Sequence, residues 1–218
     1  MMEDITNLPL ALFLIMYFII YLTAFFIFFW ARAPDLRPKA SSCSISLAHG
    51  TPAVFLSSYV ILSDPSIHFH SPNSLQNLVL EYSIAYFLMD LLHPLVFSST
   101  DVLYIDHHLC TLFVFLICRY VAYHGAFAIL VLLILAEVTS FCQNLWTLAG
   151  ARRSDLKFAA MLYDFLSPPF YAFYTIIRGF LASYFVYQML VRGAGHGAIP
   201  QWVWISWHFF FCDCGYFS

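Results

Sequence analysis

The sequence has very little charge for its length. Only 10% of its 218 residues are Asp, Glu, Lys or Arg, whereas 62% are hydrophobic and 20% are aromatic. A soluble domain usually has roughly 25% charged residues, so too few polar side chains are present here to cover a water-facing surface. The scarcity of charge therefore excludes a water-soluble globular protein and predicts an integral membrane protein.

The patterns typical of metal centres, disulfide frameworks and nucleic-acid sites are also missing. The nine histidines do not form the HxxxH and HxxHH clusters of membrane di-iron enzymes, and the six cysteines form no CxxC pair or zinc-type spacing. We therefore expect no metal site, no cofactor, and cysteines that pack as small apolar side chains. No basic patch indicates nucleic-acid binding.

Long apolar runs are what the sequence has in abundance. A helix needs about 20 mostly apolar residues to cross a bilayer, and open strand edges are not stable in hydrocarbon. Seven segments have about this length, and the second and the last are the least apolar: 8–30, 45–62, 78–97, 102–121, 125–148, 157–191 and 201–217. The predicted fold class is therefore all-α and polytopic, with one N-terminal transmembrane helix followed by six more.

The basic residues are concentrated in two of the predicted loops. Six of the nine lie after the first span or between the fifth and the sixth: Arg32, Arg37, Lys39, Arg152, Arg153 and Lys157. Four spans separate the two loops, so both lie on the same side of the membrane. Because cytosolic loops carry an excess of Lys and Arg, that side is predicted to be cytosolic and the N-terminus lumenal or extracellular.

Several predicted spans carry polar side chains along one face. Polar groups inside a bilayer are costly and usually face a cavity or one another, and residues seven or eleven apart return to nearly the same face of a helix. We predict that these stripes line a lipid-accommodating cavity. Its predicted wall residues are Asp90, His93, Asp106, Thr111, Arg119, Glu137, Asn144, Asp164, Tyr171 and Arg178.

Two features of the sixth span lead to more specific expectations. Arg178 should pair with Glu137 or Asp90 on another helix, because an unpaired guanidinium inside a bilayer is costly. The tandem Pro168–Pro169 should kink or break the helix, since proline removes an amide donor. Such a kink either accommodates a long segment or shapes the cavity.

The stretch DHHLCT, residues 106–111, places an aspartate and two adjacent histidines at the head of an apolar span. One interpretation is a metal site, because imidazole and carboxylate are good ligands. The other is nucleophilic or general-base chemistry by His107 or His108, because imidazole titrates near neutral pH. Adjacent helical residues point about 100° apart, so only one of the pair can face a given substrate atom. The other must orient, bind or pack.

The HH-x-x-T motif, with Tyr120 nine residues after Thr111, resembles the signature of the TLC domain. This family includes ceramide synthases, translocation-associated membrane proteins and smaller TLC-domain proteins, and the similarity covers roughly residues 40–215. The resemblance implies a six-helix bundle in the endoplasmic reticulum. We therefore assign residues 1–40 to an N-terminal transmembrane anchor with its basic cytosolic loop, and residues 41–218 to the TLC domain.

The resemblance also suggests two functions. Ceramide synthases of this family use the paired histidines to transfer an acyl group from acyl-CoA, which implies that role for His107 and His108. Their pattern continues one helix later with two aspartates, where this sequence reads ILAEVTSFCQNLW, with Glu137 and Asn144 instead. The difference favours a protein that binds, senses or handles a membrane lipid or fatty acyl chain and supports lipid homeostasis. The alternative is an acyl-CoA-dependent acyltransferase.

Overall fold

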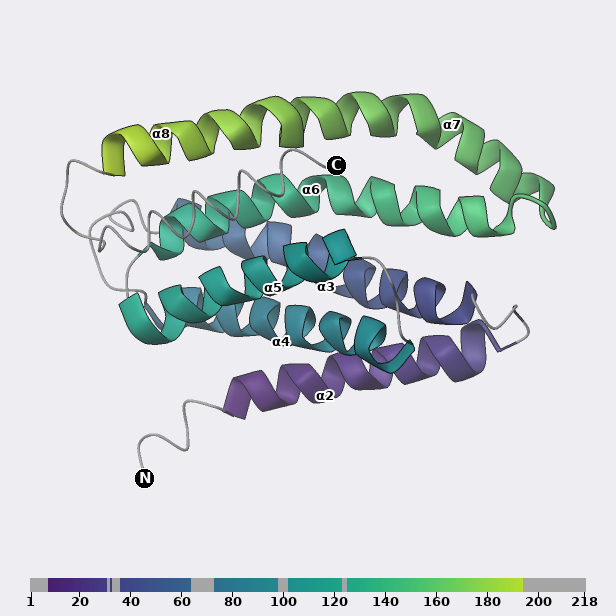
Figure 1. The fold of residues 1–218 in the computed structure, drawn as a ribbon, viewed down its shortest axis with the longest axis horizontal. Helices are drawn as coiled ribbons and strands as arrows, with labels where there is room; N and C mark the ends of the chain where they lie inside the picture. Colours follow the sequence, from purple (N-terminus) through teal and green to yellow (C-terminus); the bar gives the residue numbers. More distant parts are fainter. Residues whose placement is uncertain are drawn as a thin grey trace.

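The structure is all-helical along the part of the chain that it describes. It is a computed structural model, and it describes residues 8–30, 32, 36–63, 73–97, 102–122 and 125–193. Figure 1 shows the helices running roughly side by side along the long axis of the molecule. Five of them are long and apolar enough to cross a membrane. The predicted fold class, an all-α polytopic membrane bundle, is confirmed.

Six continuous helical segments account for nearly all of the described residues. The elements are α2 (Leu8–Thr23) with η1 (Ala24–Phe28), α3 (Leu36–Ser63), α4 (Ser74–Phe97), α5 (Val102–Leu116) with η2 (Ile117–Ala122), α6 (Ala126–Arg152), and α7 (Lys157–Tyr174) with η3 (Thr175–Ala182) and α8 (Ser183–Gly193). The η stretches are π-helical, with wider turns than an α-helix, and such turns are frequent at functional sites. Here η2 contains Arg119 and η3 contains Arg178.

The five helices that could cross a membrane match the first five predicted spans. They are Leu8–Phe28, Leu36–Ser63, Ser74–Val96, Tyr104–Val121 and Ala126–Arg152. The second begins well before the predicted start at residue 45, because its first turns contain Arg, Lys and Ser side chains that obscure a helix in a search for apolar runs. Helix formation extends past the apolar segment because helical hydrogen bonds do not depend on hydropathy.

The predicted sixth span, 157–191, corresponds to the continuous helix of α7, η3 and α8. This helix is not among the five, because Lys157, Asp164 and two prolines lower the apolar character of α7. Its crossing of the membrane stays a prediction. The predicted seventh span, 201–217, lies outside the described residues.

The helices pack in the order α5–α4–α3–α6–α7. α2 packs against α4 and α3 outside this row, with Tyr17, Tyr21 and Ala24 as its buried residues. Figure 1 shows α2 along one side of the bundle and α7 with α8 along the opposite side. α4 contacts α2, α3 and α5, so it is the most buried of the five spans. Because lipid is as apolar as a buried side chain, close van der Waals packing stabilises such contacts.

The two basic loops lie at the same end of the bundle. Arg32, just after η1, forms a salt bridge with Asp155, which lies between α6 and α7. Figure 1 shows the end of α2, the start of α3 and the turn from α6 to α7 gathered at that end. The prediction that these loops share one side is confirmed. The assignment of that side to the cytosol remains a prediction.

The tandem proline does not break its helix. α7 continues through Pro168 and Pro169 and runs directly into η3. Figure 1 shows that the ribbon from α7 to α8 bends but stays continuous. The expected break is therefore wrong and the expected bend is present. A proline removes only its own amide donor, so the flanking hydrogen bonds can keep the helix together.

Candidate functional site

The centre of the bundle contains a buried pair formed by His108 on α5 and Asp90 on α4. His108 Nε2 lies 3.0 Å from Asp90 Oδ2, and both side chains are almost fully buried. Three hydroxyl groups also donate to Asp90: Ser42 to Oδ1 at 2.7 Å, Tyr86 to Oδ2 at 3.2 Å, and Tyr104 to Oδ2. A carboxylate that accepts this many hydrogen bonds is well satisfied in its ionised form.

The second ring nitrogen of His108 is also occupied. Nδ1 lies 2.9 Å from the carbonyl oxygen of Tyr104, one turn earlier on α5. Both ring nitrogens therefore lie against oxygen atoms of the protein. His108 is held in place between α4 and its own helix, and neither nitrogen is open to a substrate.

His107 has different surroundings from its neighbour. Its side chain is exposed, and its ring is nearly perpendicular to that of His108, with the ring centroids 5.5 Å apart. Thr111 Oγ1 donates to the backbone carbonyl of His107 at 2.8 Å, one turn earlier in α5, so this hydroxyl group does not orient the imidazole. Asp106 is exposed as well, 3.9 Å from Cys110 Sγ, and does not join the buried pair.

A second polar centre lies between α3 and α6. Glu137 is buried, and its Oε1 lies 3.7 Å from His49 Nδ1. The other ring nitrogen of His49 lies 3.1 Å from Ser83 Oγ on α4. The His49 ring stacks on Tyr86, with centroids 4.1 Å apart and planes 6° apart. Because Tyr86 also donates to Asp90, this stack between α3 and α4 connects the two polar centres.

Arg178 approaches the second centre from η3 without pairing to a carboxylate there. Its Nε donates to Thr139 Oγ1 at 3.1 Å, and its Nη2 donates to the Ala136 carbonyl at 2.8 Å and to Ser140 Oγ at 3.4 Å. The predicted pairing with Glu137 or Asp90 is therefore wrong. Neutral oxygens of α6, including the buried hydroxyl groups of Thr139 and Ser140, satisfy the guanidinium. The two carboxyl groups have other partners.

Four predicted residues lie elsewhere in the bundle. His93 contacts α2, with Nδ1 3.2 Å from the Tyr21 hydroxyl. Arg119 donates from Nε to Glu81 Oε1 at 2.9 Å, near the opposite end of α5 from the histidine pair. Asp164 and Tyr171 are exposed on α7. The helical spacing identified polar faces correctly, but polar faces at different depths in a bundle do not meet at one point.

Several residues that connect the helices were missed by sequence reasoning. Ser46 is one of them, and it accepts a hydrogen bond at 2.8 Å from Asn144, which was predicted. Trp146 is another, and its Nε1 donates to Ser167 at 2.8 Å. Glu81 is the partner of Arg119. A signal existed for Glu81, because an intramembrane carboxylate and an intramembrane arginine on neighbouring spans each need a partner. Single serines gave no such signal. Along the described part of the chain, no group of three or more His, Cys, Asp or Glu side chains could hold a metal ion.

Comparison with known proteins gives one clear family relationship. A profile of the TLC domain matches residues 39–215 of the chain. A TLC domain-containing protein from Arabidopsis thaliana is 55% identical over 210 residues, which cover 94% of this chain and 82% of the relative. No solved structure matches the chain.

Proposed function

Because the chain belongs to the TLC-domain family of multi-pass membrane proteins, we propose that it binds a membrane lipid or fatty acyl chain between its helices and so supports lipid homeostasis. One observation carries the proposal. The His107 imidazole on α5 is exposed beside the buried His108, and the Arg178 guanidinium on η3 is held by neutral oxygens of α6, so each keeps hydrogen-bonding capacity for a ligand. We place both polar groups at the border of one lipid-binding space.

These two groups suit the polar part of an amphiphile. A guanidinium has five N–H donors, and an imidazole can donate and accept. The hydrogen bonds of Arg178 to α6 involve Nε and Nη2, so we assign Nη1 to the lipid. A phosphate, carboxylate or carbonyl oxygen would accept from it and from His107. The acyl chain would lie along the apolar side chains of the neighbouring helices, because it has no polar groups that need hydrogen bonds.

Analysis of the lipids that copurify with the protein tests this function. We expect His107→Ala and Arg178→Gln to reduce the bound lipid about tenfold or more, because each removes a hydrogen bond to a charged or strongly polar group. Asp106→Asn is the matched control, since Asp106 is exposed next to His107 but lies outside the buried pair. If all three variants retain the lipids of the wild type, the proposed site is wrong.

A second candidate function, acyl transfer, is favoured by the difference between the two histidines. His108 has both nitrogens occupied, whereas the His107 ring is exposed. A His107 nitrogen would attack the carbonyl carbon of a fatty acyl-CoA, the C–S bond would break, and coenzyme A would leave with the imidazole proton. An amine or hydroxyl acceptor would then take the acyl group and restore the ring. No cofactor besides acyl-CoA, the substrate, is needed.

Mass spectrometry distinguishes this candidate from lipid binding. If transfer occurs, incubation with acyl-CoA should add one acyl mass to His107. The adduct should persist in Asp106→Asn and disappear in His107→Ala. An adduct on a cysteine, or none at all while a lipid still copurifies, would leave lipid binding as the function.

The cellular site of this function is also part of the proposal. The family resemblance points to the endoplasmic reticulum. A fluorescently tagged chain should overlap with a reticulum marker, and cells that lack the protein should show a changed membrane lipid profile. Colocalisation with another organelle would move the proposed role there.

A further inference from the structure

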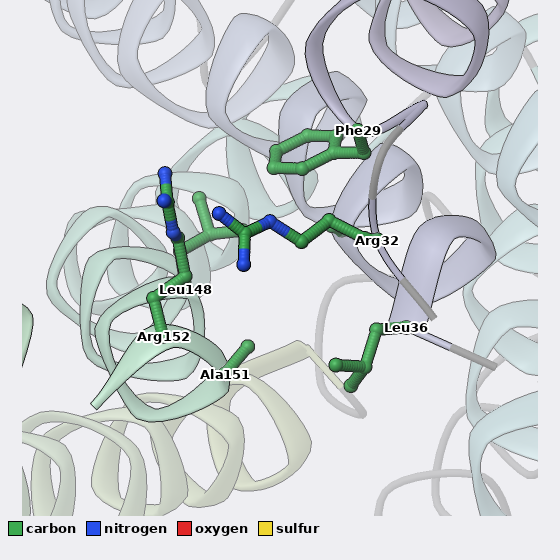
Figure 2. A pocket seen from close by; sticks show the side chains of 7 residues that line it. Phe29, Arg32, Leu36, Leu148, Ala151 and Arg152 are labelled. Carbon is green, nitrogen blue, oxygen red and sulfur yellow. The ribbon is translucent and has the colours of Figure 1, made fainter. Parts of the chain in front are cut away.

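A small cavity opens at the end of the bundle where the two basic loops meet. Its volume is about 140 Å³, and it is bounded by the chain just after η1, the first turns of α3 and the last turns of α6. The residues that line it are Phe29, Arg32, Leu36, Ala40, Leu148, Ala151 and Arg152. Figure 2 shows the two arginine side chains reaching it from opposite sides, with apolar side chains around them. The cavity is therefore apolar in its walls and cationic at two points.

The arginines of the cavity are not fully satisfied by the protein. The Nε of Arg152 is buried and has no hydrogen-bond partner among the described residues. A buried donor is costly to leave unpaired, and an acceptor bound in the cavity would satisfy it. Arg32 forms a salt bridge with Asp155, but the Arg32 side chain remains 27% exposed and can bind a second acceptor.

The surroundings of the cavity add further positive charge. Arg37 donates from Nε to the Arg32 carbonyl at 3.2 Å and stacks over Trp30, and Arg153 stacks over Tyr163. At this end of the described chain, Asp155 is the carboxylate that faces these guanidinium groups. The local balance is therefore strongly positive, and the cavity attracts anions.

The position of the cavity selects the kind of anion. It lies where one membrane helix ends, the next begins and a third ends, so its depth is that of the boundary between hydrocarbon and water. Basic pockets between transmembrane helices at this depth bind the head groups of anionic lipids. A cavity of about 140 Å³ has room for a group of several heavy atoms, such as a phosphate.

We propose that this cavity binds the phosphate group of an anionic membrane phospholipid. Arg152 and Arg32 donate to the phosphate oxygens, and Leu36, Ala40 and Ala151 contact the glycerol and the first methylene groups. The site lies at the basic end of the bundle and is distinct from the space bordered by His107. It therefore does not depend on the function proposed above. The apolar walls favour a membrane lipid over free phosphate.

Native mass spectrometry of the purified chain in detergent tests the site. The probes are phosphatidic acid, phosphatidylcholine, and glycerol phosphate as a soluble head group. We expect phosphatidic acid to bind more tightly than phosphatidylcholine, and Arg152→Gln to weaken its binding about fivefold, because a basic residue near a membrane surface contributes about one factor of this size. Arg152→Lys should keep much of the binding. Glycerol phosphate should compete poorly.

Two further variants separate lipid binding from a structural role of the arginines. Arg153→Gln is the matched control, because it removes an adjacent charge from a residue that does not line the cavity; it should bind like the wild type. Asp155→Asn should bind phosphatidic acid more tightly, because it frees Arg32 from its salt bridge. The proposal is overturned if Arg152→Gln is folded, with an unchanged thermal midpoint, and binds phosphatidic acid like the wild type. It is also overturned if Arg153→Gln weakens binding as much as Arg152→Gln, or if glycerol phosphate competes as well as the lipid.

Discussion

A single glycine marks a close approach between α3 and α6. A Cβ atom on Gly50 of α3 would lie 2.5 Å from Oε2 of Glu137 on α6 and 3.6 Å from the Cβ atom of Ser140. Small residues let membrane helices approach closely. Here the absence of a side chain makes room for a carboxyl group in the centre of the bundle.

We therefore expect Gly50→Ala to lower stability by about 1 kcal/mol, the lower end of the cost of overpacking, because the Glu137 carboxyl group would have to move away from its place beside His49. Thermal unfolding of the purified protein measures this loss. Gly179→Ala is the matched control, because the nearest atom to its added Cβ would be Thr175 Cγ2 at an ordinary 3.8 Å. Alanine is also the better helix former, so the control should be neutral or slightly stabilising. Equal losses in both variants would contradict the role of Gly50.

At the scale of helices, the contact between α6 and α7 depends on one partly buried hydrogen bond and a set of rings. Trp146 on α6 donates to Ser167 Oγ on α7, and its ring stacks on Tyr163 and Phe170 with centroid distances of 5.0 and 5.2 Å. The serine hydroxyl in turn donates to the Tyr163 carbonyl, so one hydroxyl serves both helices.

Ser167→Ala should weaken this helix pair by about 1 kcal/mol, because it leaves the indole N–H without its acceptor. Thr147→Ala is a suitable control, since the Thr147 hydroxyl donates only within its own helix, to the Gln143 carbonyl. A denaturant titration that follows tryptophan fluorescence measures the difference. The prediction fails if the two variants unfold at the same midpoint.

The salt bridge between the basic loops makes the contact of two elements depend on pH. Hydrogen bonds from Ser154 and Arg32 lower the pKa of Asp155 below its ordinary value of 3.8. A carboxyl whose pKa is lower in the folded state stabilises that state above its unfolded pKa, and this contribution is lost as the pH falls through the folded pKa. The contact is therefore intact at neutral pH and is lost progressively below about pH 4.

Comparison of Asp155→Asn with the wild type across pH checks this dependence. The variant should be less stable at pH 7, and the difference should shrink toward zero below about pH 4, where the wild-type carboxyl is protonated too. Because the pair is exposed to solvent, high salt should reduce the same difference at neutral pH. A difference that persists unchanged at pH 3 would show that the side chain acts through packing.

For the whole molecule, the sequence alone predicted the membrane class, the all-α fold and the first five spans, because these depend on the length and composition of apolar runs. It also predicted that the two basic loops lie at the same end of the bundle, because an even number of spans separates them. It could not predict the partner of Arg178, since neutral oxygens on α6 leave no signature in a list of charges. Nor could it tell His107 from His108, because their roles depend on the rotation of α5 against α4.

The topology of the whole chain gives a further prediction. Glycosylation acceptors engineered near residue 70 and near residue 192 should be modified, because both loops are predicted to be lumenal. An acceptor near Arg152 should stay unmodified, because that loop is predicted to be cytosolic. Modification near Arg152 would reverse the orientation, and its loss near residue 192 alone would change the number of spans.

The pairing between α4 and α5 has a consequence for biosynthesis. α4 carries Glu81 and Asp90, and their partners lie on the next helical segment, Arg119 on η2 and His108 on α5. Glu81 and Arg119 are 38 residues apart. At a synthesis rate of about 5–20 residues per second, Arg119 is therefore made roughly 2–8 s after Glu81, and during this time the acidic side chain of α4 is without its partner. An acidic residue in mid-bilayer costs about 2.5–3.5 kcal/mol, so α4 should wait beside the translocon and enter the lipid together with α5. A chain stalled between the two helices should cross-link to the translocon, whereas one stalled after α5 should not.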